Sequence, residues 1–483
     1  MASKPAHGRD LTQGPIGKTL LVFALPTLAS SILQSLNGTV NAIWVGRFLG
    51  ENALAATSNA NMIMFLLMSF VFGFGMAATV LIGQAFGRRD VDGARRVVGT
   101  TMGFFFFVAI GIGAFGWYFS PALLKLLGTP SGAAPLALAY LRVIFLAMPS
   151  ILLTVLMMMA LRGSGDALSP LFLMILAVVL DAGLNPVFIL GLGPAPKLGI
   201  AGSATATLIA NVVTFCAFLT YIYTRDLPLR LRGKELKYLK PDWAILKTII
   251  VKGIPMGLQM IVISASALAL IGLVNREGVD TTAAFGVAMQ LWAYLQMPAM
   301  AFGAAVSAMT AQNIGAGRWD RVSTITRSGV IYALVITGVL VVLLAVADRP
   351  ALALFLGGHS PALPIARHIQ LLATWSFLLM GVTMVLFGTV RANGAVIGPL
   401  IILSIGLVPV RLGFALGAYP WLKADALWLS FPVSSVANIS LAIAFYLHGG
   451  WKKARMLVPP SVDEAIEESE AMMEPGGRLN PSG

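Results

Sequence analysis

The chain has 483 residues, of which 58% are hydrophobic and 11% are charged, with a formal net charge of +13. Soluble domains carry about 25% charged residues, so the composition excludes an ordinary soluble protein and indicates a polytopic membrane protein. Most of the 33 Lys and Arg residues lie before the first apolar run, in alternate loops and in the C-terminal tail. This is the positive-inside pattern, which predicts both termini in the cytoplasm and no nucleic-acid partner.

Apolar runs long enough to span a bilayer recur along the sequence, and in lipid they must be helical to satisfy their backbone groups. We therefore predict an all-α membrane protein with twelve transmembrane helices. The predicted spans are 18–46, 53–83, 98–122, 135–161, 167–192, 198–223, 245–274, 281–312, 323–346, 365–390, 396–418 and 426–448.

Polar residues follow a proline in the first span. Pro26 disrupts a helix through its missing amide and its ring, so we predict a hinge there. Gln34, Asn37 and Asn41 then follow a three-then-four spacing and share one helix face. Amides in a membrane helix either hold helices together or line a binding site, and both alternatives remain open for Gln34 and Asn37. Asn61 adds polarity to the second span.

Asp181 is the one charged residue in the apolar run 167–192. A carboxylate at this depth costs a few kcal/mol, so such residues usually face the bundle interior and mark ion or substrate paths. Asn185 lies four residues on, hence on the same face, and in the sixth span Thr207 and Asn211 are also four apart. We predict that Asp181 is functional. The alternative is an Asp that only pairs with a neighbouring helix.

The second half begins after a basic segment, 225–243, which predicts a cytoplasmic linker that also contacts anionic lipid headgroups. In the seventh and eighth spans, amides and aromatic rings are suited to stacking on and hydrogen bonding an organic ligand. Arg411, in the eleventh span, is the one deep cation. The candidate substrate cavity comprises Gln34, Asn37, Asn61, Asn211, Gln259, Gln290 and Tyr294.

The sequence repeats itself at an offset of 228–229 residues. Each half has an even number of spans, so the two halves enter the membrane in the same orientation. We predict two six-helix lobes related by a pseudo-two-fold axis along the membrane normal, an arrangement suited to alternating access. The alternative is a duplication retained only for packing. The aligned pairs include Pro26 with Pro255, Gln84 with Gln312, Gly87 with Gly315 and Arg162 with Arg391; Asp181 aligns with Val410.

The repeat also predicts the domain organisation. Pro255 becomes a second candidate hinge through its alignment with Pro26. The tail is acidic and then rich in Pro and Gly, so we expect it to be disordered. The predicted segments are a cytoplasmic N-terminus (1–17), the N-lobe (18–224), the cytoplasmic linker (225–243), the C-lobe (244–450) and the cytoplasmic tail (451–483).

Over about residues 15–450 the sequence resembles the multidrug and toxic compound extrusion (MATE) family, of the NorM and DinF kind. One of the matching segments alone would be a weak signal, whereas all of them in order on a duplicated frame are a strong one. The segments are Val40–Arg47, Gln84–Gly87 with its echo Ala311–Gly317, Leu161–Asp166, Leu180–Ile189 and Gly199–Thr207.

The resemblance implies a secondary antiporter that exports organic cations and amphipathic drugs in exchange for H⁺ or Na⁺. It further implies a monomer without a cofactor in the cytoplasmic (inner) membrane of a bacterium. The cation-coupling positions of the family match Asn41, Asp181, Asn185 and Thr207. The chain departs from the family at two places. Asn41 replaces the acid of the first span. In the fifth span the acid, Asp181, comes before the amide, Asn185, whereas much of the family has the amide first. With one carboxylate, H⁺ is favoured, because hard cations usually take several oxygen ligands, often with more than one charge.

Other functions fit the sequence less well. A flippase of a lipid-linked saccharide needs a strongly cationic cavity, and Arg411 is the one deep cation. A membrane enzyme needs a nucleophile or metal cluster at depth, and His7, His359, His368 and His448 lie near span ends or outside the spans. We therefore expect no enzyme and no metal site beyond a Na⁺ at Asp181. A channel is a third alternative, against which two lobes with an asymmetric site argue modestly.

Overall fold

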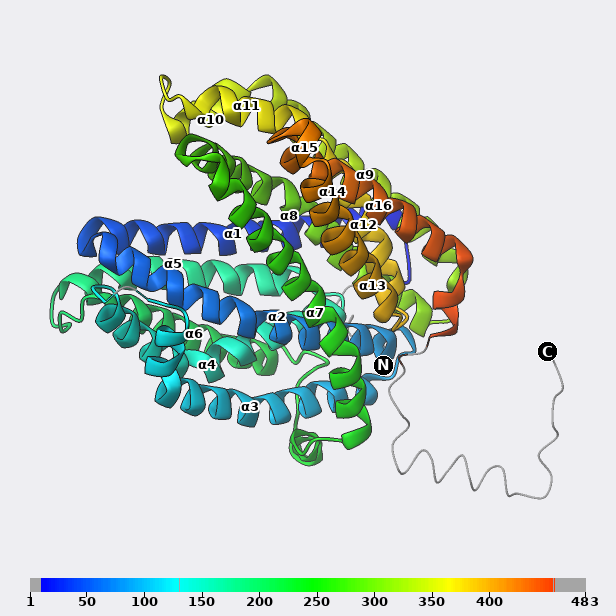
Figure 1. Ribbon diagram of the computed structural model, residues 1–483. Coiled ribbons are helices and arrows are strands. Elements are labelled where there is room, and N and C mark those ends of the chain that lie inside the picture. The colour runs from blue at the N-terminus through cyan, green and yellow to red at the C-terminus, as the bar shows by residue number, and fades with distance from the viewer. Residues whose placement is uncertain (1–9, 130, 455, 457–483) are drawn as a thin grey trace, which may run out of the picture.

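The computed structural model describes residues 10–129, 131–454 and 456, and these form helices without any strand (Figure 1). Most of the predicted tail, and the first nine residues of the predicted N-terminus, lie outside the described residues. The longer helices are α1 (Ile16–Leu49), α2 (Glu51–Gly87), α3 (Val91–Leu126), α4 (Ala134–Gly163), α5 (Leu168–Leu190), α6 (Ile200–Thr224), α7 (Trp243–Val274), α8 (Val279–Gly315), α9 (Trp319–Val346), α12 (Ser376–Arg391) and α16 (Asp425–His448). The shorter elements are η1 (Gly233–Leu239), η2 (Asn275–Glu277), α10 (Asp348–Leu356), α11 (Ala362–Ala373), α13 (Ile397–Ile405), η3 (Gly406–Val410), α14 (Arg411–Gly417), α15 (Tyr419–Leu422) and η4 (Gly450–Lys453).

The helices account for the twelve predicted spans. In the described part of the chain, ten helices are long and apolar enough to cross a membrane, and α11 with α12 make an eleventh. α8 is 37 residues long but falls outside that set, because Thr, Gln and Asn side chains lower its hydropathy. With α8 the count is twelve, which confirms the predicted fold class.

Two spans predicted as single helices are broken, which corrects the sequence-based prediction. The tenth span, 365–390, is α11 followed by α12, with a bend of 46° between them. The eleventh, 396–418, passes from α13 through the π-helical turn η3 into α14. Pro409 lies in η3 and has no amide to donate, so the regular hydrogen-bond ladder cannot pass through it.

The two candidate hinge prolines lie inside continuous helices. α1 runs unbroken through Pro26 and α7 runs unbroken through Pro255. Around Pro26, the hydroxyls of Thr27 and Ser30 donate to the carbonyl oxygens of Phe23 and Pro26, at 3.1 and 2.9 Å. Neither proline kinks its helix sharply enough to interrupt it here, so their role as hinges stays a prediction.

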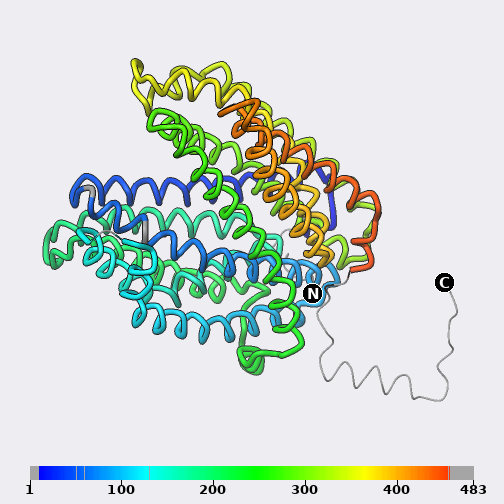
Figure 2. Tube along the Cα trace, viewed as in Figure 1, coloured from blue at the N-terminus to red at the C-terminus, as the bar shows by residue number. Residues whose placement is uncertain are grey.

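The helices form two inclined groups. Figures 1 and 2 show α1–α6 lying alongside one another, α9–α16 inclined to them, and α7 and α8 between the two groups. α2 packs against α7 and α8, and α1 packs against α8. Where α2 crosses α8, a Cβ on Gly87 would overlap the carbonyl oxygen of Gln312, and a Cβ on Gly315 would overlap that of Gln84. The aligned glycines thus allow the close approach that joins the groups.

Candidate functional site

Asp181 lies at the centre of a polar cluster between three helices. Its side chain, on α5, is only 2% exposed. One carboxylate oxygen, Oδ2, accepts hydrogen bonds from the amides of Asn37 and Asn41 on α1, at 2.9 and 3.0 Å. The other, Oδ1, accepts a hydrogen bond from the hydroxyl of Thr207 on α6 at 3.0 Å. The carboxylate therefore connects α1, α5 and α6.

Asn185 closes the cluster one turn further along α5. Its amide nitrogen donates to Asn41 Oδ1 at 2.6 Å, to the backbone oxygen of Asp181 at 2.8 Å and to Asp181 Oδ1 at 3.3 Å. The four predicted cation-coupling residues, Asn41, Asp181, Asn185 and Thr207, thus form one hydrogen-bonded cluster around the carboxylate. Asn37, predicted only as a cavity or packing residue, joins them.

Small residues on α6 bring Thr207 within reach of Asp181. A Cβ on Gly202 would overlap the backbone carbonyl of Phe188, so only glycine allows α6 to lie this close to α5. Ser203 and Ala206, on the same stretch, are buried. The segment Gly199–Thr207 is therefore a packing surface that ends in the hydroxyl bonded to Asp181.

The cluster gives the Asp181 carboxylate hydrogen-bond donors but no counter-ion. Amide and hydroxyl groups donate to both oxygens of Asp181, and within the described residues no Lys, Arg or His side chain pairs with it. Charge-assisted hydrogen bonds of this kind stabilise a buried carboxylate without neutralising it. Two buried amide oxygens, Asn37 Oδ1 and Asn185 Oδ1, have no hydrogen-bond partner. A proton or a small cation would bring the missing positive charge.

Two further residues contribute to this site: Asn37, whose role the sequence left open, and Tyr140, which the sequence did not indicate. Asn37 lies four residues before Asn41, so the spacing that grouped them on one face also placed it beside the carboxylate. Tyr140 on α4 is buried within electrostatic range of Asp181. No sequence pattern linked Tyr140 to the fifth span. In the part of the chain that the structure describes, no three His, Cys, Asp or Glu residues could together hold a metal ion.

The predicted substrate-cavity residues differ in their surroundings, and their shared role in a cavity stays a prediction. Asn211 lies one turn beyond Thr207 on α6 and donates to the backbone oxygen of Thr207 at 2.9 Å. Gln259 is buried between Arg391, which donates to it at 2.6 Å, and the Val396 carbonyl. The remaining positions are exposed on their helices: Gln34 on α1, Asn61 on α2, and Gln290 and Tyr294 on α8.

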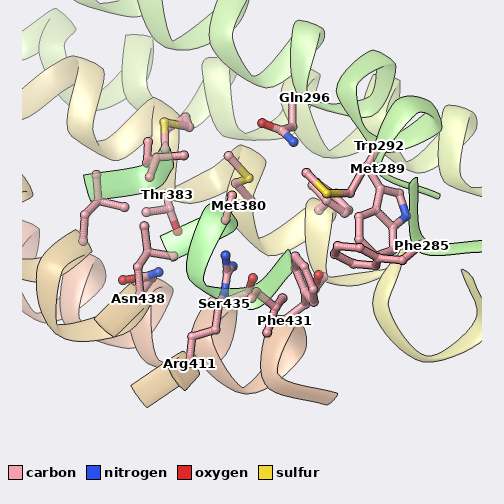
Figure 3. Close-up of a pocket in the computed structure, with 18 residues that line it drawn as sticks. Phe285, Met289, Trp292, Gln296, Met380, Thr383, Arg411, Phe431, Ser435 and Asn438 are labelled. Carbon is pink, nitrogen blue, oxygen red and sulfur yellow. The ribbon is translucent and has the colours of Figure 1, made fainter. Parts of the chain in front are cut away.

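A separate cavity of about 100 Å³ lies among α7, α8, α12, α13, η3, α14 and α16 (Figure 3). Its wall combines the rings of Phe285, Trp292 and Phe431 with the polar side chains of Arg411 and Asn438. Sequence analysis singled out Arg411 but not the cavity, because the lining residues come from segments up to about 170 residues apart.

Comparison with known proteins gives a consistent result. The MatE family model matches residues 26–187 and 255–416, two segments separated by the offset of the internal repeat. The probable multidrug resistance protein YoeA of Bacillus subtilis is 36% identical over 457 residues, covering 94% of this chain and 98% of that protein. An FAD transporter of Shewanella oneidensis is 27% identical over 352 residues, covering 73% and 76%. A solved MOP superfamily transporter from Pyrococcus furiosus shares the fold, with a TM-score of 0.83 at 22% identity, covering 93% and 98%.

Proposed function

Because this chain belongs to the MatE family of transporters, we propose that it exports organic cations and amphipathic drugs in exchange for H⁺ or Na⁺. Family membership makes it a multi-pass membrane transporter and not an enzyme. The name of the Bacillus relative, a probable multidrug resistance protein, supports drugs as the exported class. The coupling ion and the residues that bind it belong to the proposal.

The observation that carries the proposal is the Asp181 cluster. A buried carboxylate with hydrogen-bond donors but no counter-ion can take up one positive charge. We assign Asp181 as the coupling carboxylate, with Asn41, Asn185 and Thr207 as its partners. Asn37 is a further partner, through its contact with Asp181 Oδ2.

The exchange would proceed through α1. Asn37 and Asn41 hold α1 against the charged Asp181. A proton or Na⁺ on Asp181 would neutralise it and weaken this attraction, so that α1 bends at Pro26 and the space beside it contracts. Drug and ion would then compete for the N-lobe. When the ion leaves on the other side of the membrane, the donors would again draw α1 to the carboxylate.

Two lobes, 18–224 and 244–450, would rock about their contact, with 225–243 joining them. The end at which Gly87 and Gly315 cross is also the end with most of the basic residues, so we infer that it faces the cytoplasm. Residues 1–17 and 451–483 would then be cytoplasmic. We propose a monomer in the bacterial inner membrane, in contact with lipid over its apolar surface.

The test is dye transport in everted vesicles that contain either the wild type or Asp181→Asn. The substitution keeps the shape of the side chain and removes its charge, so ion-driven uptake of a cationic dye should fall to background at unchanged expression. Asp226→Asn is the matched control, because Asp226 is exposed on the linker and its substitution should leave transport unaltered. Full transport by Asp181→Asn would refute the assignment.

The same vesicles identify the ion. We expect a pH gradient to drive uptake and a Na⁺ gradient at fixed pH to be ineffective, because Asp181 is the one carboxylate in the cluster. The amide oxygens of Asn37 and Asn185, which have no hydrogen-bond partner, favour Na⁺ instead, because hard cations bind to oxygen atoms. Na⁺-stimulated uptake at fixed pH would overturn the preference for H⁺.

A second candidate function is export of a metabolite. The relative named as an FAD transporter makes this class worth testing. A flippase of a lipid-linked saccharide remains the other alternative, and it would require a cavity with several cations. Uptake of FAD or of a labelled lipid-linked saccharide by the everted vesicles, in place of the dye, would favour these alternatives.

A further inference from the structure

We propose that the cavity around Arg411, here called the Arg411 cavity, binds the anionic group of small aromatic or amphipathic organic acids. The inference rests on the proposed transport function and extends its substrates from cations to anions. The Arg411 cavity is the 100 Å³ space lined by Arg411, Asn438, Ser435, Phe431, Trp292 and Phe285, among others (Figure 3).

Arg411 brings a positive charge that no acidic side chain among the described residues balances. In the described chain its hydrogen bonding consists of one contact, from Nε to the hydroxyl of Ser434 at 3.0 Å. Its guanidinium lies 4.5 Å from the ring centre of Phe431. A guanidinium has five N–H donors, so most of them are left for a ligand. Figure 3 shows the guanidinium directed into the space between α12 and α16.

Among the described residues of the second half, no acidic side chain forms an ion pair or hydrogen bond with Arg411. None of the residues that line the Arg411 cavity is an Asp or Glu. Each acid instead lies at or near a helix end, and three of them have partners there: Tyr419 contacts Glu277, Arg367 contacts Asp348 and His368 contacts Asp425. The acids concerned are Glu277, Asp280, Asp320, Asp348 and Asp425.

The backbone is shaped to present Arg411. The residue directly follows the π-helical turn η3, and such turns are frequent at functional sites because they change the direction in which side chains point. Ser266 on α7 donates to the carbonyl oxygen of Leu407 at 2.8 Å and holds the turn. A Cβ on Gly406 would overlap the amide of Asn438, so glycine lets that amide lie against the turn.

Asn438 is the second polar group of the site. It is 7% exposed, and its Oδ1 has no hydrogen-bond partner. Figure 3 shows its amide nitrogen on the side of Arg411. An amide N–H and a guanidinium that converge on one space match the two oxygens of a carboxylate.

The opposite wall favours an aromatic body on the ligand. Trp292 and Phe431 have ring centres 4.9 Å apart, and Phe285 lies edge-on to Trp292 at 6.0 Å. The indole N–H of Trp292 is already bonded to Gln370 and Thr374, so its ring offers apolar surface. Sites for drug-sized ligands have about 300–1,000 Å³, so this partly open cavity takes an acidic group and the ring next to it, and the rest of a larger ligand would extend out of it. A cation would be repelled by Arg411.

The test is binding of 2-naphthoate and of its neutral isostere 2-naphthamide to the purified protein in nanodiscs, by calorimetry in chloride-free buffer. The wild type should bind naphthoate about 10- to 100-fold more tightly than the amide, as expected for a charge-assisted hydrogen bond. Arg411→Gln should reduce the affinity for naphthoate to that for the amide. Asn438→Asp, which adds a competing carboxylate, should do the same. Equal affinities in the wild type, or unchanged naphthoate binding in both variants, would refute the proposal.

Two controls separate the possible causes of failure. Arg367→Gln makes the same change of charge at an exposed position of α11 and should leave naphthoate binding unchanged. Because the binding assay uses no ion gradient, Asp181→Asn should also leave it unchanged. Loss of dye transport in Asp181→Asn without loss of naphthoate binding would establish the two sites as independent. If Arg411→Gln does not fold, Asn438→Asp provides the decisive comparison.

Discussion

The two α1 residues that donate to Asp181, Asn37 and Asn41, differ in their number of hydrogen bonds. Asn41 both donates to the carboxylate and accepts from Asn185, whereas Asn37 has a single hydrogen bond, to Asp181 Oδ2. A hydrogen bond to a charged group contributes about 1.5–3 kcal/mol. Asn37 is therefore energetically significant even though its amide oxygen has no partner.

We predict that Asn37→Ala lowers the initial rate of ion-driven dye uptake by about tenfold, through the loss of this charge-assisted hydrogen bond. Asn41→Ala should lower the rate at least as much, because it removes two contacts. Thr39→Val is the control: its hydroxyl bonds only to Ser35 within α1, and this variant should transport normally. An Asn37→Ala variant with wild-type rates would mean that α1 does not depend on this contact.

The contact between Asp181 and Asn185 could be predicted from the sequence because it is local. Asp181 and Asn185 are one helical turn apart, and a single acidic residue in an apolar run indicates a candidate functional residue. The contacts to Asn41 and Thr207 were expected from the family resemblance, not from spacing. The Arg411 cavity could not be predicted, because its walls come from α7, α8, α12, α16 and the α13–η3–α14 span, which only tertiary packing brings together.

At the level of elements, the linker is a structural part of the N-lobe. Arg95 and Arg96 at the start of α3 bind Glu235 and Asp242, at 2.5 and 2.7 Å. The hydroxyl of Tyr238 donates to Asp92, and partial burial together with this carboxylate raises the pKa of Tyr238 to about 12. The tyrosine therefore stays protonated and bound at neutral pH. Sequence analysis assigned these charges to topology and lipid contact and missed the pairing with α3.

Asp242 joins the linker to α7. Its carboxylate caps that helix by accepting from the amides of Ala244 and Ile245, at 2.9 and 3.4 Å. Partial burial alone would raise the pKa of Asp242, but the hydrogen bonds from Arg96 and from these amides outweigh it and hold the pKa below its ordinary value. The charged form is therefore the one that stabilises the fold.

A group with a lowered pKa stabilises the fold above its unfolded pKa, near 3.9, and that stability is lost as the pH falls through the folded value. We predict that Asp242→Asn lowers the unfolding temperature in detergent at about pH 7 and that the difference from the wild type shrinks below about pH 4. Asp242→Ala, which also removes the cap, should be less stable by roughly a further 1 kcal/mol. A pH-independent difference for Asp242→Asn would show that the charge does not contribute.

The broken spans illustrate a limit of hydropathy. The run 396–418 is uniformly apolar apart from Arg411, so its periodicity predicts one helix. Pro409 was the local sign of an interruption. The form of that interruption, a π-helical turn, depends on Ser266 of α7 and on Asn438 of α16, which the sequence of the span does not contain.

Across the whole molecule, the internal repeat reappears as a pair of equivalent contacts between the lobes. Gln84 at the end of α2 donates to the carbonyl oxygen of Ala392 at 2.7 Å. Gln312 at the end of α8 donates to that of Gly163 at 3.1 Å. Gln84 aligns with Gln312 in the repeat, and Gly163 aligns with Ala392. Both glutamines are buried, so each bond replaces contact with water.

The duplication predicted two equivalent lobes, but it could not predict their inclination. That angle depends on which ends of the lobes touch, and the touching residues belong to opposite halves of the chain. Once the structure brings Gln84 and Gln312 to the same end, their role follows. They stabilise the arrangement in which the lobes meet at the predicted cytoplasmic end.

We therefore predict that Gln84→Ala combined with Gln312→Ala shifts the protein toward the opposite arrangement. Loss of two hydrogen bonds of about 1 kcal/mol each would change the ratio of the two states by roughly 10- to 30-fold. Spin labels at Leu126 and Val346, which are more than 80% exposed at the other end of the lobes, would report this as a larger population of short distances. Native Cys216 must first be replaced, because it is exposed.

Thr326→Val is the matched control for this experiment. It removes the buried hydrogen bond to Thr389, 2.8 Å long, which lies within the C-lobe. The variant should lower the unfolding temperature without changing the distance distribution, because both states of the transporter keep that contact. If the glutamine variant behaves like Thr326→Val, the two glutamines only stabilise the fold. If the distances shift only in the glutamine variant, the aligned pair Gln84 and Gln312 controls which end of the two lobes is closed.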